Sequence, residues 1–266
     1  MSIKNYIPTF IKPLAHEIKF RLLKNIDEDL LKFEVKDMQL QWKKVIDNSK
    51  ILIASVENLD KKQHILFVTG YGLGTHFLTV EPIVAMGLYA RGCKISSLYC
   101  NKSLPACEFN TVGNNKQSSI SELKKGVTST AVTFKCNKCR NNIEKTYEIL
   151  PINLNGYEKY LNNHDYKLAL DKSEEVKFNN FRDFTYNAIG VGEEAFASIL
   201  RATFMGEVQD TYINRHLVKR YIVSGILTAI AYERAYEALK PDKIVCIHGI
   251  YQIHGLAVKV ANKLNI

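Results

Sequence analysis

The chain has 266 residues, of which 46% are hydrophobic and 24% charged, and its net charge is +9 at neutral pH. This length and composition allow one large domain or two modest ones with a real core, and they exclude a disordered or fibrous chain. No apolar run is long enough to span a membrane, and the first residues lack the apolar segment of a secretory signal. We therefore expect a cytoplasmic protein, with a peripheral position at the inner face of the membrane as a second possibility. The positive charge predicts an anionic partner, but the basic residues are spread out, which makes nucleic acid an unlikely one.

Residues 1–62 are predicted to form a helical N-terminal extension. Apolar residues from Ile3 to Leu22 recur at helical spacing, with several lysines on the opposite side of the predicted helix. Pro8 and Pro13 interrupt this pattern. A basic amphipathic start of this kind can lie on a membrane surface or pack on its own domain. A second helix is expected over about residues 37–58.

Residues 63–266 are predicted to form a Rossmann-like α/β domain with a parallel sheet. An apolar run at 64–69 indicates a buried strand, a helix follows over about 75–91, and residues 93–99 form a second strand. Pro82 is expected to kink or restart that helix. Further along the chain we expect helices at 193–205 and 215–239, a strand at 243–247 and a helix at 254–264. Residues 100–140 interrupt the alternation as a polar insertion that carries cysteines.

A glycine-rich loop follows the first strand. Glycines allow tight turns and close approach to a ligand, and the start of the next helix offers free N–H groups to an anion. The spacing G-x-G-x-G does not match the dinucleotide fingerprint, and the second strand carries no acidic residue, so NAD binding is disfavoured. We predict substrate contacts from five residues of this loop, namely Gly70, Tyr71, Gly72, Gly74 and Thr75.

Histidines follow two of the predicted strands. His76 begins the helix after the glycine loop and is a candidate general base, although a histidine there can also only pack or cap. Glu81 is a candidate for orienting a substrate. His248, Tyr251 and His254 follow the strand at 243–247 and are predicted to line the same crevice, with a metal site as the less favoured alternative.

Four of the six cysteines, Cys100, Cys107, Cys136 and Cys139, fall within 40 residues. Cys136 and Cys139 form a C-x-x-C pair, and Cys100 and Cys107 can complete a four-thiolate structural zinc site. A redox-active C-x-x-C is the competing interpretation, and it is disfavoured because no helix is expected directly after the pair.

The ordered set of motifs resembles the N-terminal acceptor domain of GT-B glycosyltransferases, in particular a subgroup linked to capsule and surface polysaccharide synthesis. The resemblance is carried by the strand, loop and His76 to Glu81 segment, Arg91-Gly-Cys93, Cys100 to Cys107, Asn187 to Glu193, Ile247 to Tyr251 and Gly255 to Ala261. It implies transfer of a sugar from a nucleotide-sugar donor to a glycan or lipid-linked acceptor, with His76 as the base. It also implies a donor domain elsewhere, downstream or in another subunit.

Two other interpretations use the same residues. A non-catalytic glycan- or protein-binding module, or a truncated remnant, would explain the missing donor domain. A zinc-ribbon nucleic-acid binder would explain the charge and the cysteines, but it leaves the histidine-bearing strand ends unused.

Overall fold

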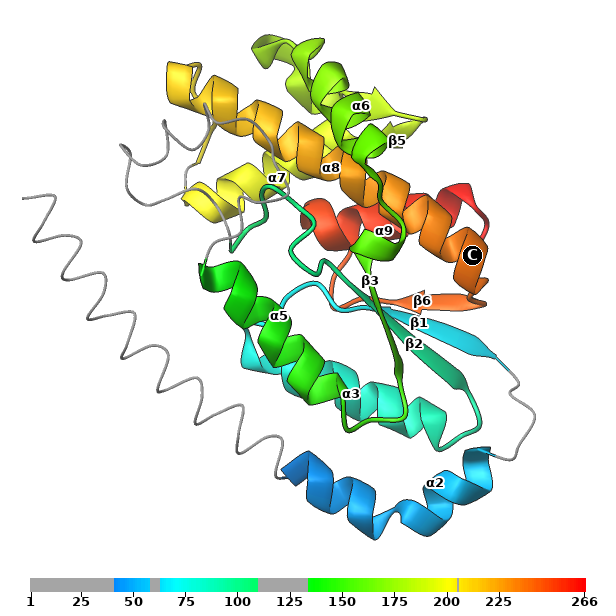
Figure 1. Ribbon diagram of the computed structural model, residues 1–266. Coiled ribbons are helices and arrows are strands. Elements are labelled where there is room, and N and C mark those ends of the chain that lie inside the picture. Colours follow the sequence, from blue (N-terminus) through cyan, green and yellow to red (C-terminus); the bar gives the residue numbers. More distant parts are fainter. Residues whose placement is uncertain (1–40, 58–62, 110–133, 205) are drawn as a thin grey trace, which may run out of the picture. The chain divides into compact units, whose positions relative to one another are not determined.

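A computed structural model describes residues 41–57, 63–109, 134–204 and 206–266 (Figure 1). The chain divides into two compact units, Met1–Asn48 and Ser49–Ile266. Within the first unit, residues 41–48 are helical. Everything described below belongs to the second unit, which also includes helix α2 (Lys50–Glu57). The N-terminal amphipathic stripe, with its expected membrane contact, lies outside the described residues.

Four parallel strands form the central sheet in the order β3-β2-β1-β6. Their bounds are β1 His64–Val68, β2 Lys94–Tyr99, β3 Asn153–Gly156 and β6 Lys243–Val245. All five residues of β1 are buried, as expected for an interior strand covered on both faces. The sheet confirms the prediction of an α/β, Rossmann-like fold.

Helices cover both faces of this sheet. Figure 1 shows α3 and α5 on one face and α8 and α9 on the other. The helical segments are α3 Thr75–Tyr89, α5 Phe134–Tyr147, α6 Asn163–Glu174, α7 Val191–Thr203, α8 Tyr212–Leu239 and α9 Leu256–Lys263. Shorter elements join them, namely η2 Tyr157–Lys159, η3 Phe178–Asp183, the hairpin of β4 Thr185–Tyr186 and β5 Ile189–Gly190, and the π-helical turn η4 Tyr251–Gly255. Pro82 lies inside α3, which runs as one helix and does not restart.

Helix α8 is the centre of the core. Its residues from Leu217 to Tyr236 are mostly buried, and it packs against α6, α7 and α9. A helix that is apolar on nearly every side is typical of a central position. Among the described residues, no helix is long and apolar enough to cross a membrane.

Helix α8 also fixes the chain that leaves β2. The Arg220 guanidinium donates to the Pro105 carbonyl at 2.7 Å, and the Ala106 N–H donates to the Ser224 hydroxyl at 2.8 Å. The Tyr221 hydroxyl donates to the Cys107 carbonyl at 3.0 Å. Because these groups are buried, their hydrogen bonds hold residues 105–107 in one place relative to the core.

Helix α5 differs from the sequence prediction. The C-x-x-C pair was expected in a polar insertion, yet both cysteines lie in the first turns of α5. One face of this helix is buried through Asn142, Ile143, Thr146 and Tyr147, of which two are polar. The apolar periodicity that reveals a packed helix is therefore weak here.

Candidate functional site

The loop that leaves β1 passes between two other elements at very short range. A Cβ atom on Gly70 would lie 2.5 Å from His254 Nε2, and one on Gly72 would lie 2.0 Å from the Cys139 carbonyl oxygen. The Gly72 N–H donates to Cys139 Sγ at 3.0 Å, and Asn142 Nδ2 donates to the Gly72 carbonyl at 2.8 Å. These glycines are thus required for contact with η4 and α5 of the same chain, whereas the sequence predicted contact with a ligand.

Two imidazoles meet beside this loop. The rings of His248 and His254 are 4.4 Å apart between centroids and nearly perpendicular, and His254 Nδ1 is 3.3 Å from either nitrogen of His248. His248 is half-buried, whereas His254 is completely buried. Both rings belong to the segment that follows β6, in which the η4 turn brings His254 back beside His248. Because β1 and β6 are neighbours, this segment leaves the sheet at the same edge as the β1 loop.

The surroundings of the two rings set the charge of His254 and the tautomer of His248. Burial, followed by the proximity of His248, lowers the pKa of His254 to about 3, so this ring is neutral at physiological pH. His248 Nδ1 lies 3.1 Å from the Ile250 carbonyl oxygen. A carbonyl only accepts hydrogen bonds, which assigns the hydrogen to Nδ1 and leaves the lone pair of the neutral His248 ring on Nε2.

The turn that carries His254 is irregular and has unpaired polar atoms. Tyr251 has φ of 65°, a left-handed conformation that costs a bulky residue about 1–3 kcal/mol. Gln252 is completely buried, and neither its side-chain nitrogen nor its side-chain oxygen has a hydrogen-bond partner within residues 41–57, 63–109, 134–204 and 206–266. The Nε2 atom of His254 is also buried and has no partner in this part of the chain. Strained turns and unpaired buried polar atoms are costly, and they concentrate at functional sites.

A third group of polar side chains connects the turn to the β1 loop. The Tyr71 hydroxyl and the Ser198 hydroxyl both donate to the carboxylate of Glu108. The backbone N–H of Gln252 donates to Ser198 Oγ at 2.7 Å. The Tyr71 ring also packs edge-on against His254, with centroids 5.5 Å apart. Burial and the Glu108 charge raise the pKa of Tyr71 well above its ordinary value, so the phenol keeps its proton.

The remaining predicted site residues fall in different places. Gly74 caps α3 with extended backbone angles that need no glycine. The side chains of Thr75 and His76 lie outside what the structure describes, so the prediction that His76 is the general base stays a prediction. Glu81 is only 3% exposed, and the Tyr147 hydroxyl donates to it at 3.4 Å. The structure brings together Gly70, Tyr71, His248, Tyr251 and His254.

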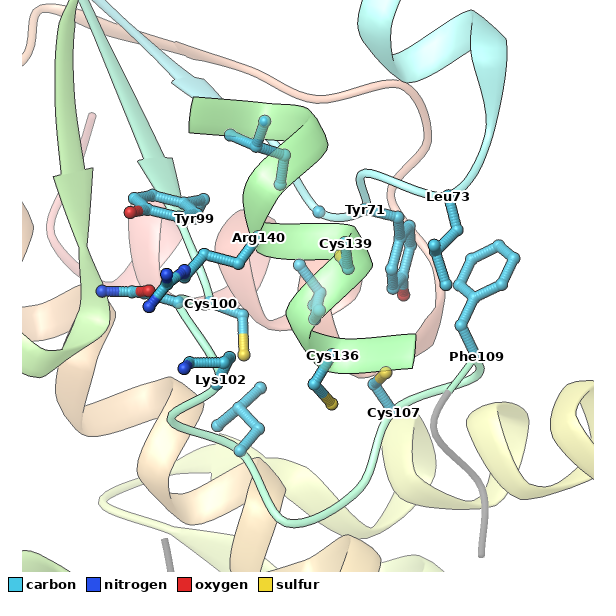
Figure 2. A pocket seen from close by; sticks show the side chains of 15 residues that line it. Tyr71, Leu73, Tyr99, Cys100, Lys102, Cys107, Phe109, Cys136, Cys139 and Arg140 are labelled. Carbon is cyan, nitrogen blue, oxygen red and sulfur yellow. The ribbon is translucent and has the colours of Figure 1, made fainter. Parts of the chain in front are cut away.

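All four predicted zinc ligands line one pocket. Figure 2 shows Cys136 and Cys139 on α5, facing Cys100 and Cys107 on the chain that follows β2. As the side chains stand, no group of three His, Cys, Asp or Glu residues in the described part of the chain is arranged to hold a metal. The six cysteines, all of them described, form no disulfide.

Glu108, Ser198 and Gln252 were missed by the sequence analysis. Glu108 and Ser198 lie in segments without a recognisable motif, and Gln252 lies between two predicted site residues, Tyr251 and His254. The three come from the chain after β2, from α7 and from η4, and they meet through the hydrogen bonds of Ser198. Single polar residues of this kind are more often surface or capping groups than site residues, so the sequence offers no signal for them.

No protein-family model matches this sequence, and no curated protein matches it. Among solved structures the chain is similar to AlbC, a cyclodipeptide synthase from Streptomyces noursei, at 9% sequence identity and a TM-score of 0.35. The match covers 69% of this chain and 81% of that chain. At this identity and TM-score it assigns no activity to the present protein.

These comparisons contradict the glycosyltransferase interpretation. The structural match is to an enzyme of another class, and no family model supports a GT-B domain or a role in capsule polysaccharide synthesis. The glycan or lipid-linked acceptor and the separate donor domain were inferred from that resemblance and are withdrawn with it. The non-catalytic binding module or remnant gains no support from the match either. The nucleotide-sugar donor has no test in the structure.

Replacing Gly72 by alanine is expected to destabilise the fold by about 1–3 kcal/mol, because the new methyl group would collide with the backbone carbonyl of Cys139. Chemical denaturation of the variant measures this loss. Gly87→Ala in α3 is the matched control: its nearest contact would be 3.6 Å away, and alanine favours a helix, so stability should stay equal or rise. Equal effects of the two substitutions would contradict the close approach.

Glu81 is expected to make the fold less stable as pH rises. Burial raises its pKa from 4.5 to about 8, which the Thr69 and Tyr147 hydroxyls partly offset, so the folded chain holds this proton more tightly than the unfolded chain. The stabilisation is complete below pH 4.5 and is lost as pH rises toward 8, at up to about 1.4 kcal/mol per pH unit.

Glu81→Gln removes this titration. The free energy of unfolding of the variant, measured by urea denaturation, should therefore rise steadily relative to that of the wild type from pH 5 to pH 8. Glu148→Gln, at an exposed position, is the control and should follow the wild type at every pH. A constant difference between Glu81→Gln and wild type across this range would show that Glu81 is not held as a neutral acid.

Proposed function

We propose that this chain is an enzyme that carries out general acid–base catalysis on a small anionic substrate at the carboxyl edge of its sheet. His248 would be the catalytic base and His254 the residue that positions it. The observation that supports this proposal is the contact between a half-buried and a fully buried imidazole on the segment that follows β6, beside the loop that follows the neighbouring strand β1. Crevices at this edge are the usual ligand sites of open α/β sheets.

The two histidines have complementary roles. His248 Nε2 carries the lone pair and takes a proton from a hydroxyl or amine of the substrate. His254 stays neutral, since its pKa is about 3, and it does not compete for that proton. A base held in place by a third group is the arrangement that activates nucleophiles in many unrelated enzymes.

The buried amide of Gln252 supports a ligand beside the histidines. Neither its side-chain nitrogen nor its side-chain oxygen has a hydrogen-bond partner among the described residues, and an unpaired buried polar group costs about 1–3 kcal/mol. A substrate that supplies one donor and one acceptor would recover that cost. The net charge of +9 favours an anionic substrate. A cytoplasmic site of action stays a prediction.

Turnover should depend on His248. The full-length protein is incubated with a mixture of phosphorylated and carboxylated metabolites, and consumption of each compound is followed by mass spectrometry. A compound consumed by the wild type should be consumed about 10²–10⁴-fold more slowly by His248→Gln, the range of a positioned acid or base. His164→Gln, an exposed histidine on α6, should match the wild type. Equal rates in all three proteins, or no consumption by the wild type, would refute the proposal.

A second pair of variants separates positioning from packing at His254. His254→Gln keeps a side-chain N–H that can reach His248, whereas His254→Leu fills the space without one. We expect the His254→Gln variant to retain more activity than the His254→Leu variant when the two have the same free energy of unfolding. Equal activity of the two variants would mean that His254 only fills the core.

A further inference from the structure

The thiol pocket has three features that bear on metal binding. Its four cysteines come from two rigid supports. Cys136 and Cys139 stand one turn apart near the start of α5, and the segment holding Cys107 is tied to α8 through the Cys107 and Pro105 carbonyls. Cys100 directly follows the last residue of β2. Figure 2 shows all four side chains around the same opening.

Two cationic side chains lie beside the thiols. A metal ion deprotonates the cysteines that it binds, so four of them carry an excess of negative charge around a divalent ion. Lys102 and Arg140 line the same pocket, where they would offset the excess negative charge of four thiolates around a divalent ion.

A backbone hydrogen bond is already directed at one sulfur. The Gly72 N–H donates to Cys139 Sγ at 3.0 Å. Outer hydrogen bonds of this kind orient metal ligands and tune the site. Because the sulfur atoms as placed are not grouped to hold an ion, binding requires some of these side chains to change rotamer into the pocket that they line.

We propose that Cys100, Cys107, Cys136 and Cys139 bind one zinc ion in a closed, four-thiolate structural site that joins α5 to the exit of β2. Four thiolates suit zinc and leave no open coordination position, so the ion supports the fold and takes no part in the chemistry. Its effect on the neighbouring site is indirect. Zinc would fix α5, and Cys139 and Asn142 of α5 hold the Gly72 backbone in place.

A redox-active dithiol is the competing explanation for the same cysteines. Cys136 lies in the first turn of a helix, where the helix N-terminus favours a thiolate. Two further cysteines, Cys100 and Cys107, line the same pocket and would have no part in that role. The two explanations make opposite predictions for metal content under reducing conditions.

The test uses the full chain, purified with a phosphine reductant and loaded with zinc sulfate. After desalting, metal analysis should find about one zinc per chain in the wild type, as for a closed structural site. The double variant Cys136→Ser, Cys139→Ser should retain at least tenfold less zinc than the wild type. The control Cys93→Ser, Cys246→Ser carries the same number of substitutions outside the pocket and should keep the ion.

Cobalt(II) titration of the wild type keeps the proposal testable if the cysteine variants fail to fold. Tetrahedral thiolate ligation predicts intense sulfur-to-cobalt absorption in the near ultraviolet and visible bands that zinc abolishes. Cys100→Ser and Cys107→Ser should each weaken the sulfur band, because one of four thiolates is lost. Absence of these bands in the wild type, no zinc retained, or equal retention in the pocket variant would overturn the proposal.

Discussion

The site depends on one close approach. Between Gly70 and Gly72 the backbone that leaves β1 passes under the His254 ring on one side and over the Cys139 carbonyl on the other, at distances that exclude even a methyl group. This contact buries His254, and burial lowers its pKa to about 3. It also brings the β1 loop, the η4 turn and helix α5 into one structure. The neutral state of the His254 ring follows from it.

The sequence predicts three of the four sheet strands, because β1, β2 and β6 each lie in a short, mainly apolar run. Strand β3, with the sequence Asn-Leu-Asn-Gly, carries no such run. The sequence also predicts that residues after β1 and β6 meet, since neighbouring parallel strands end at the same edge. Helix α5 was missed because its buried face includes Asn142 and Thr146, which hide the apolar period. The burial of Glu81 was missed because nothing in a sequence distinguishes a buried carboxyl group from a solvated one in the first turns of a helix.

The family interpretation failed for a related reason. Glycines, histidines and tyrosines at the exits of parallel strands satisfy the geometry of many α/β proteins, so similar short motifs arise without shared function. In this chain Gly70 and Gly72 allow the backbone to pack against its own neighbours. The residues that give the site its character, Glu108, Ser198 and Gln252, lie outside those motifs.

The account requires His254 to be a neutral ring covered by the Gly70 backbone. Nitrogen-15 NMR of the histidine side chains, recorded from pH 4.5 to pH 8, tests this requirement most directly. The account predicts that the His254 signals keep the shifts of one neutral tautomer across the whole range. Titration of His254 near pH 6.5, the value of an exposed imidazole, would contradict it.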